Sequence, residues 1–107
     1  MIMISTLRTA NFDLGVTNVP GTHIIRFWAE WCGPCRMVAP VFEQIATEMT
    51  DKASFAEIDI DLSPEIATRF KVQSIPTLLI VKEGEEVARF VGAAGHGQIT
   101  QFIQQNV

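Results

Sequence analysis

The sequence has 107 residues, of which 48% are hydrophobic and 19% are charged, and its formal net charge at pH 7 is -4. This length suits one domain, and the composition excludes an intrinsically disordered chain. The eight Lys and Arg residues are scattered and form no basic run, which argues against a surface for nucleic acids or anionic membranes. We therefore expect a single domain over residues 1–107, with no nucleic acid or membrane partner.

The first residues and the cysteine count bear on the compartment. The start MIMISTLR lacks the apolar run of a secretory signal, and no stretch reaches the roughly 18 apolar residues of a membrane-spanning helix. Two cysteines in 107 residues are too few for the disulfide framework of a small secreted protein. We expect a cytoplasmic protein, by default a monomer, whose two cysteines work as a reactive pair.

Strand-like and helix-like segments alternate in the first half of the chain. Residues 1–7 are β-prone, residues 11–16 are helix-like but weakened by Gly15, and residues 23–29 form the nearly continuous apolar run of a central strand. Residues 36–49 repeat apolar side chains at helical spacing. Pro40 lies inside this helix and should bend it. The predicted apolar face comprises Met37, Val38, Val41, Phe42, Ile45, Ala46 and Met49.

The second half continues the alternation. Residues 54–61 alternate like a strand, and residues 63–70 read as a short helix with Ser63 at its N-cap. Residues 75–92 split at Glu83-Gly84 into a β-hairpin, and residues 96–107 form an amphipathic helix. The inward side chains of this last helix are Ile99, Phe102 and Ile103. The order predicts an α/β fold with a central mixed five-stranded sheet flanked by four helices on both faces.

Both cysteines lie directly after the predicted central strand, in the stretch WCGPC. Cys32 should sit at the N-terminus of the long helix, at the sheet edge where open α/β folds place their sites. Free backbone N–H groups and the positive end of the helix dipole stabilise a thiolate, so the pKa of Cys32 should fall below about 8.5. Residues i and i+3 face each other across one helical turn, so Cys35 can close a disulfide with Cys32. Gly33 and Pro34 tighten the turn between them.

Two structural alternatives compete with a redox pair. A C-x-x-C pair is half of a zinc site, and His23 and His96 are the other soft ligands. His23 lies at the far end of its strand and His96 opens the last helix, so neither has finger-like spacing, and we expect no metal. The second alternative is a pair of inert core cysteines, which the Gly-Pro dipeptide at a helix start disfavours.

The segment FWAEWCGPCR, the distant IPT and a glycine after the last strand resemble the thioredoxin family over nearly the whole chain. The resemblance implies the thioredoxin fold and a protein-disulfide reductase that carries no cofactor beyond its redox-active disulfide. It implies two kinds of partner, disulfide-containing target proteins and an NADPH-dependent flavoprotein, thioredoxin reductase. By resemblance, Cys32 is the attacking thiol and Cys35 the resolving thiol of two successive exchange reactions.

The resemblance also implies a surface on which target proteins dock. Pro76 matches the family's cis proline, and a cis bond there would leave the backbone of Ile75 free to pair with an extended substrate. Trp28 is better interpreted as core packing than as part of this surface. The matching docking positions are Trp31, Gly33, Pro34, Ile75, Pro76, Gly92 and Ala93.

Two charged positions depart from the family pattern. Most thioredoxins have a buried aspartate where this chain has Arg26, and usually a lysine where it has Glu57. One substitution alone would leave a buried unpaired charge costing several kcal/mol, whereas a swapped pair satisfies itself. We expect an Arg26–Glu57 ion pair beneath the catalytic cysteines, with Glu57 as the proton acceptor and a lowered thiol pKa beside Arg26. In the alternative, Arg26 reaches the surface and Glu57 is merely solvated.

Two other functional classes remain open. One is an oxidase or isomerase on the same fold, which the Gly-Pro dipeptide disfavours; a redox potential near about -270 mV would indicate a reductase, and one near about -180 to -120 mV the alternative. The other is a non-catalytic binding subunit that uses only the apolar surface. A protein with Cys32→Ser and Cys35→Ser that kept full biological activity would select this last class.

Overall fold

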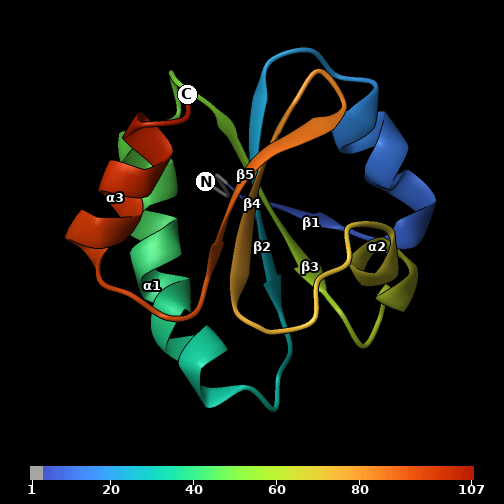
Figure 1. Ribbon diagram of the computed structural model, residues 1–107, viewed down its shortest axis with the longest axis horizontal. Helices are drawn as coiled ribbons and strands as arrows, with labels where there is room; N and C mark the ends of the chain where they lie inside the picture. Colours follow the sequence, from blue (N-terminus) through green and yellow to red (C-terminus); the bar gives the residue numbers. More distant parts are fainter. Residues whose placement is uncertain (1–3) are drawn as a thin grey trace.

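The computed structural model describes residues 4–107 as a five-stranded sheet with helices on both faces (Figure 1). The strands are β1 (Ile4–Leu7), β2 (Thr22–Trp28), β3 (Ser54–Asp59), β4 (Thr77–Lys82) and β5 (Glu85–Val91). The helices are the 3-10 helix η1 (Thr9–Asn11), the π-helix η2 (Asp13–Thr17), α1 (Gly33–Glu48), α2 (Pro64–Arg69) and α3 (His96–Gln104). The predicted α/β class and the five strands are confirmed, while the part of the first strand predicted at residues 1–3 lies outside the described residues.

The sheet is mixed, with the strand order β1-β3-β2-β4-β5. β3 runs parallel to both β1 and β2, whereas β4 runs antiparallel to β2 and to β5. The hairpin between β4 and β5 turns at Glu83 and Gly84, whose φ angles are 51° and 81°. Two successive positive φ angles suit the twist of a two-residue hairpin turn. The predicted split of residues 75–92 is therefore confirmed.

β2 sends alternate side chains into two separate cores, because successive residues of a strand point to opposite faces. Ile25 and Phe27 join the core that contains residues of η2 and α2, on one side of the sheet. Ile24 joins the core formed with α1 and α3 on the other side (Figure 1). Arg26 and Trp28 share the face of Ile24. Arg26 therefore interrupts an otherwise apolar row beneath α1.

α1 packs one face against the sheet, but the face is narrower than the sequence suggests. Its buried side chains are Cys35, Val38, Phe42, Ile45 and Ala46. Met37, which we expected on this face, is 74% exposed. It lies about 100° around the helix from Val38, and Val41, one turn later, is only partly buried. α1 continues through Pro40, which lies on the exposed side.

The structure differs from the sequence-based expectations at three places. The helix expected over residues 11–16 is the irregular pair η1 and η2. Ser63 occupies the N-cap of α2, but its hydroxyl accepts a 3.1 Å hydrogen bond from the N–H of Thr9 instead of capping the helix. β3 ends at Asp59 because the Asp59 carboxylate accepts a 2.8 Å bond from the N–H of Asp61 and turns the chain. Among the helices described, none has the length and apolar character needed to cross a membrane.

Candidate active site

The two cysteines lie where β2 leads into α1, as predicted. Cys32 has an extended backbone (φ -91°, ψ 106°) and is the N-cap residue of α1, while Gly33 and Pro34 begin the helix. A proline in the first turn loses nothing, because its missing N–H would have had no helical partner. Cys32 and Cys35 form a disulfide with 5.3 Å between their Cα atoms. The strand, the Gly-Pro pair and the helix thus bring the two sulfurs together.

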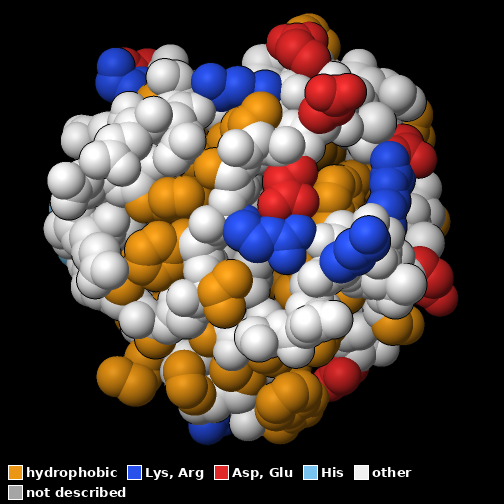
Figure 2. All heavy atoms as spheres, in the orientation of Figure 1, with side chains coloured by type: hydrophobic (Ala, Val, Ile, Leu, Met, Phe, Trp, Pro, Cys, Tyr) orange, Lys and Arg blue, Asp and Glu red, His pale blue; other side chains and the backbone are white. Residues whose placement is uncertain are grey.

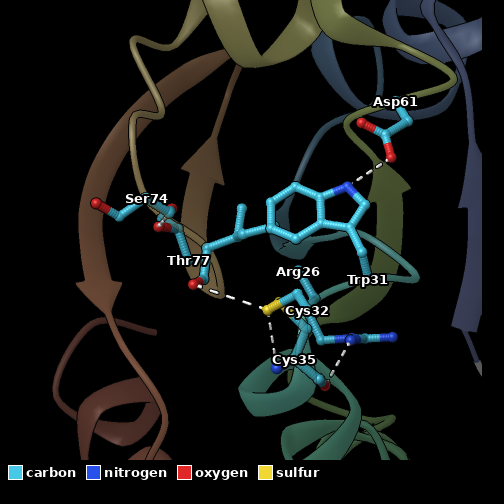
Figure 3. Close-up of a disulfide and its surroundings, with 8 residues drawn as sticks. Arg26, Trp31, Cys32, Cys35, Asp61, Ser74 and Thr77 are labelled. Atoms are coloured by element: carbon cyan, nitrogen blue, oxygen red, sulfur yellow. Dashed lines mark hydrogen bonds between the residues drawn. A yellow bond between two sulfur atoms is a disulfide. The ribbon is translucent and has the colours of Figure 1, made fainter.

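The sulfur of Cys32 lies at the positive end of α1. Its Sγ accepts a 3.1 Å hydrogen bond from the backbone N–H of Cys35 (Figure 3). This N–H is one of the donors at the start of a helix that have no carbonyl partner within the helix. A hydrogen bond to the charged form, together with the helix dipole, favours the thiolate over the thiol. The geometry therefore provides a hydrogen-bond donor for the Cys32 sulfur at the start of the helix, as the sequence predicts.

The two sulfur-bearing residues differ in access. Cys32 keeps 5% of its surface exposed, whereas Cys35 has none. Both belong to a small cluster with Ala29, against which other apolar side chains pack. These packing side chains are Trp28, Ile60 and Ile75. Although Cys32 is less exposed than an ordinary surface cysteine, it is the only one of the two that an incoming sulfur can approach from solvent.

The predicted docking residues surround Cys32. The Ile75–Pro76 peptide bond is cis, as predicted. The carbonyl oxygen of Ile75 lies 3.9 Å from the Sγ of Cys32, and the N–H of Gly92 donates a 2.9 Å bond to the carbonyl of Pro76. Ala93 follows Gly92 and is exposed. The start of β4 and the end of β5 are therefore joined beside the cysteines.

The end of the molecule where α1 begins is rich in hydrophobic surface. Figure 2 shows apolar side chains gathered along the lower part of the molecule, which is where α1 begins in Figure 1. Trp31 is 66% exposed and Val91 is 56% exposed, while Gly33 and Pro34 are also exposed. Exposed apolar groups of this kind are typical of surfaces that bind other proteins. Val91 and the exposed Met37 extend the surface beyond the residues predicted for it.

Trp31 is held by a residue that the sequence did not reveal. Its indole Nε1–H donates a 2.8 Å hydrogen bond to the carboxylate of Asp61 (Figure 3). Asp61 is fixed in turn by the bond from its N–H to the carboxylate of Asp59. The available signal was an acidic residue two positions after another at the end of a strand, a common turn arrangement. The loop after β3 thus orients the exposed tryptophan.

Arg26 is buried beneath the first turn of α1. Its side chain is 5% exposed, and its Nη2 donates a 2.7 Å hydrogen bond to the carboxylate of Glu57, whose side chain is 23% exposed. The two residues are direct partners in the parallel register of β2 and β3, so their side chains share one face. The expected ion pair is present, and the alternative that Arg26 extends to the surface is wrong.

The guanidinium of Arg26 also contacts the active-site helix. Its Nη1 donates a 3.2 Å bond to the backbone carbonyl of Cys35 (Figure 3). Its carbon lies 5.2 Å from the ring centroid of Trp28 and 5.8 Å from that of Phe42, within the range of cation–π attraction. Trp28 is partly buried between the guanidinium and the cysteine cluster, in keeping with its interpretation as packing. The sequence did not predict the bond to the Cys35 carbonyl.

The two histidines take no part in this site. The Nε2 of His23 lies 2.9 Å from the carbonyl oxygen of Val19, and the Nε2 of His96 lies 2.6 Å from the carboxylate of Glu48. Across residues 4–107, no group of three or more His, Cys, Asp or Glu side chains is arranged to hold a metal ion. The zinc alternative therefore gains no support from the positions of its candidate ligands.

Comparisons with known proteins agree with the geometry. The profile of the family named Thioredoxin matches residues 3–105. A thioredoxin of Mycobacterium tuberculosis is 49% identical over 98 residues, covering 92% of this chain and 84% of the relative. A thioredoxin of Staphylococcus saprophyticus is 39% identical over 98 residues, covering 92% of each chain. A bifunctional thioredoxin reductase/thioredoxin of Mycobacterium leprae is 50% identical over 98 residues, covering 92% of this chain and 21% of the longer relative.

Proposed function

Because the chain belongs to the thioredoxin family and is a protein-disulfide oxidoreductase with a redox-active cysteine pair, we propose that Cys32 attacks target disulfides and that Cys35 resolves the mixed disulfide. One observation carries this assignment. The Sγ of Cys32 accepts the N–H of Cys35 at the start of α1 and retains some exposure, whereas Cys35 is fully buried. We therefore assign the attack to the sulfur that has both a backbone donor and access to solvent, and the resolving step to the buried sulfur beside it.

The exchange takes place in two steps. The Cys32 thiolate attacks one sulfur of the target disulfide, a mixed disulfide forms, and the second target sulfur leaves as a thiolate that takes up a proton. Cys35 then loses its proton and attacks the Sγ of Cys32. The bond between Cys32 and the target breaks, and its sulfur leaves as a second thiolate that is protonated. The target gains two electrons and two protons, and this chain is left with the Cys32–Cys35 disulfide.

We assign target docking to the apolar residues around Cys32. The carbonyl of Ile75 beside the Cys32 sulfur gives an extended target segment a backbone acceptor at the reacting atoms. The exposed ring of Trp31, held by Asp61, provides a rigid apolar contact beside Cys32. The proposed surface comprises Trp31, Gly33, Pro34, Ile75, Pro76, Gly92 and Ala93.

We further propose that Arg26 and Glu57 serve the resolving cysteine. Glu57 is the proton acceptor for Cys35, acting through water, because its carboxylate combines partial exposure with a link through Arg26 to the Cys35 backbone. Partial exposure gives the accepted proton a route to solvent. Arg26 anchors the Glu57 carboxylate beneath the first turn of α1.

The electron donor that we propose is a thioredoxin reductase that uses NADPH. The Mycobacterium leprae relative supports this partner, because its name joins a thioredoxin reductase and a thioredoxin in one chain. In this cycle the Cys32–Cys35 disulfide is the redox group of this chain, which needs neither a metal nor a second cofactor. We propose that the protein works as a monomer in the cytoplasm, where the reducing environment maintains the dithiol form.

Insulin reduction tests the proposed function. We expect turbidity from reduced insulin when the protein is mixed with NADPH and a bacterial thioredoxin reductase, and none when Cys32 is replaced by Ser. A protein that fails this assay but rearranges scrambled disulfides would be an isomerase. One whose double variant Cys32→Ser, Cys35→Ser keeps full biological activity would be a binding subunit. Either result would overturn the reductase assignment.

A further inference from the structure

Cys35 lies in surroundings that are poor at holding a negative charge. It has no exposed surface, and apolar side chains pack against the cysteine cluster. They are Trp28, Ile60 and Ile75, and Ala29 belongs to the cluster itself. A thiolate in such a cluster loses its hydration, which raises the pKa of the buried thiol. Resolution of a mixed disulfide nevertheless requires Cys35 as a thiolate, so a stabilising group has to come from the protein.

Arg26 is the buried cation at this position. Among residues 4–107, the buried polar or charged side chains are those of His23, Arg26, Ser63 and Thr77, and Arg26 is the only Lys or Arg among them. Its Nη1 lies 3.2 Å from the backbone oxygen of Cys35, so the charge is placed against the first turn that carries the sulfur.

The guanidinium has unused hydrogen-bonding capacity. An arginine has five N–H donors, and here Nη1 bonds the Cys35 carbonyl and Nη2 bonds Glu57, while the buried Nε has no hydrogen-bond partner. Buried donors are normally satisfied, so an unpartnered one calls for an explanation, and a redox role is one of those that apply. When the disulfide opens, the Cys35 thiolate adds a negative charge to the same residue whose carbonyl the guanidinium already bonds.

We propose that Arg26 is a positioning residue for the resolving step, its buried guanidinium stabilising the negative charge on the Cys35 sulfur when the disulfide is open. This inference rests on the proposed roles of Cys32 and Cys35. The electron pair of the stabilised thiolate forms the new bond to the Sγ of Cys32, and the target sulfur leaves with the pair of the broken bond. The proton that Cys35 gave up passes to Glu57 or to water.

Glu57 can accept the Cys35 proton, but the charge of its carboxylate acts on the Cys35 thiolate in the opposite sense to Arg26. Its carboxylate partly neutralises the guanidinium, so its negative charge makes a nearby thiolate less favourable. The other ionisable group beside Cys35 is Cys32, whose charge is held by the helix N-terminus. Asp59 is on the same face of β3, but its carboxylate accepts the N–H of Asp61. The two members of the ion pair should therefore shift the Cys35 pKa in opposite directions when each is neutralised.

The experiment is an NMR titration of 13C-labelled cysteines in the reduced protein, which reports Cys32 and Cys35 separately. We expect Arg26→Met to lower the acid dissociation constant of the Cys35 thiol about tenfold, and Glu57→Gln to raise it severalfold. Arg26→Lys should recover most of the native acidity, because it keeps the charge. If Arg26→Met acts only through packing, Arg26→Lys will not rescue and the two single variants will shift Cys35 in the same direction.

Arg69→Met is the matched control. Arg69 also pairs with a carboxylate and lies over two aromatic rings, but its partners are Asp13, Phe12 and Phe70 on the other face of the sheet. This variant changes the net charge equally and should leave Cys35 unchanged. The proposal is overturned if Arg26→Met changes the acid dissociation constant of Cys35 by less than about threefold. It is also overturned if Arg69→Met changes this constant as much as Arg26→Met does. Insulin reduction by the native protein is scored separately, so failure of the proposed function is distinguishable from failure of this inference.

Discussion

The backbone N–H of Cys35 donates a 3.1 Å hydrogen bond to the Sγ of Cys32, so the residue that we propose as resolving contacts the sulfur that we propose as attacking. There is no equivalent bond in the other direction, because the backbone N–H of Cys32 donates to the carbonyl of Ala29 and not to the Sγ of Cys35. Together with the difference in exposure, this asymmetry is our basis for proposing different roles for two cysteines only three residues apart.

The asymmetry predicts which single variant traps a target. With Cys35→Ser, Cys32 still attacks but no second thiol releases the product, so a mixed disulfide with a protein target should accumulate. With Cys32→Ser, the fully buried Cys35 should trap little or none. Non-reducing electrophoresis and intact mass measure both adducts. Equal trapping by the two variants would show that burial does not assign the roles.

The bond between Trp31 and Asp61 should matter for protein substrates and little for small ones. Asp61→Ala removes the acceptor of the indole N–H, and we expect a two- to fivefold fall in kcat/KM for insulin, equivalent to about 0.5–1 kcal/mol. Asp61→Asn, which keeps an acceptor oxygen, is the matched control and should lose less. An equal loss of activity toward a small aromatic disulfide would place the effect in the chemistry and not in docking.

The ion pair between Arg26 and Glu57 should contribute unequally to stability. Glu57→Gln leaves a 5% exposed guanidinium without its counter-ion, and we expect a loss of about 3 kcal/mol in the free energy of unfolding. Arg26→Met leaves a carboxylate that water can reach, so its cost should be smaller. The double variant should be more stable than Glu57→Gln alone. Urea unfolding of the oxidised proteins measures all three, and a Glu57→Gln variant as stable as the native protein would contradict the expectation.

The contact between His96 and Glu48 links α3 to the end of α1 and should be visible in acid titrations. The hydrogen bond from His96 holds the pKa of Glu48 below its ordinary value, with a smaller contribution from Gln44. Because the folded-state pKa is lowered, the stabilisation is present above the unfolded-state pKa and is lost as the pH falls through the folded-state pKa. NMR titration should show the pKa of Glu48 rising in His96→Ala and rising less in Gln44→Ala. The reverse ranking would contradict the assigned cause.

Local patterns in the sequence predicted the cysteine environment well. An apolar strand, a Gly-Pro pair and a helical repeat all lie between residues 23 and 49, and together they place Cys32 at a helix N-terminus. The pairing of Arg26 with Glu57 was also predictable, because the resemblance to the thioredoxin family marked both positions as charge-reversed and a buried charge requires a partner of opposite sign. The five-strand mixed sheet followed from helices between some strands and a turn between others.

Contacts that depend on the final geometry could not be predicted in the same way. The bond from Trp31 to Asp61 joins residues 30 positions apart, and the bond from Arg26 to the Cys35 carbonyl depends on how far α1 overlies β2. The exposure of Met37 depends on the rotation of α1 about its axis, which an apolar count does not determine. Hydrophobic periodicity predicts the faces of single elements and carries no information on such contacts between them.

The most direct test of Cys32 as the reactive sulfur is the alkylation of the reduced protein by iodoacetamide. Its rate is followed from pH 5 to 10, and mass spectrometry locates the modified cysteine. A sulfur stabilised by the amide of Cys35 should react as Cys32 alone, with a midpoint below the value of about 8.5 for a free thiol and a rate severalfold above that of an ordinary thiol at pH 6. A midpoint at about 8.5, or labelling of Cys35 as rapid as that of Cys32, would contradict it.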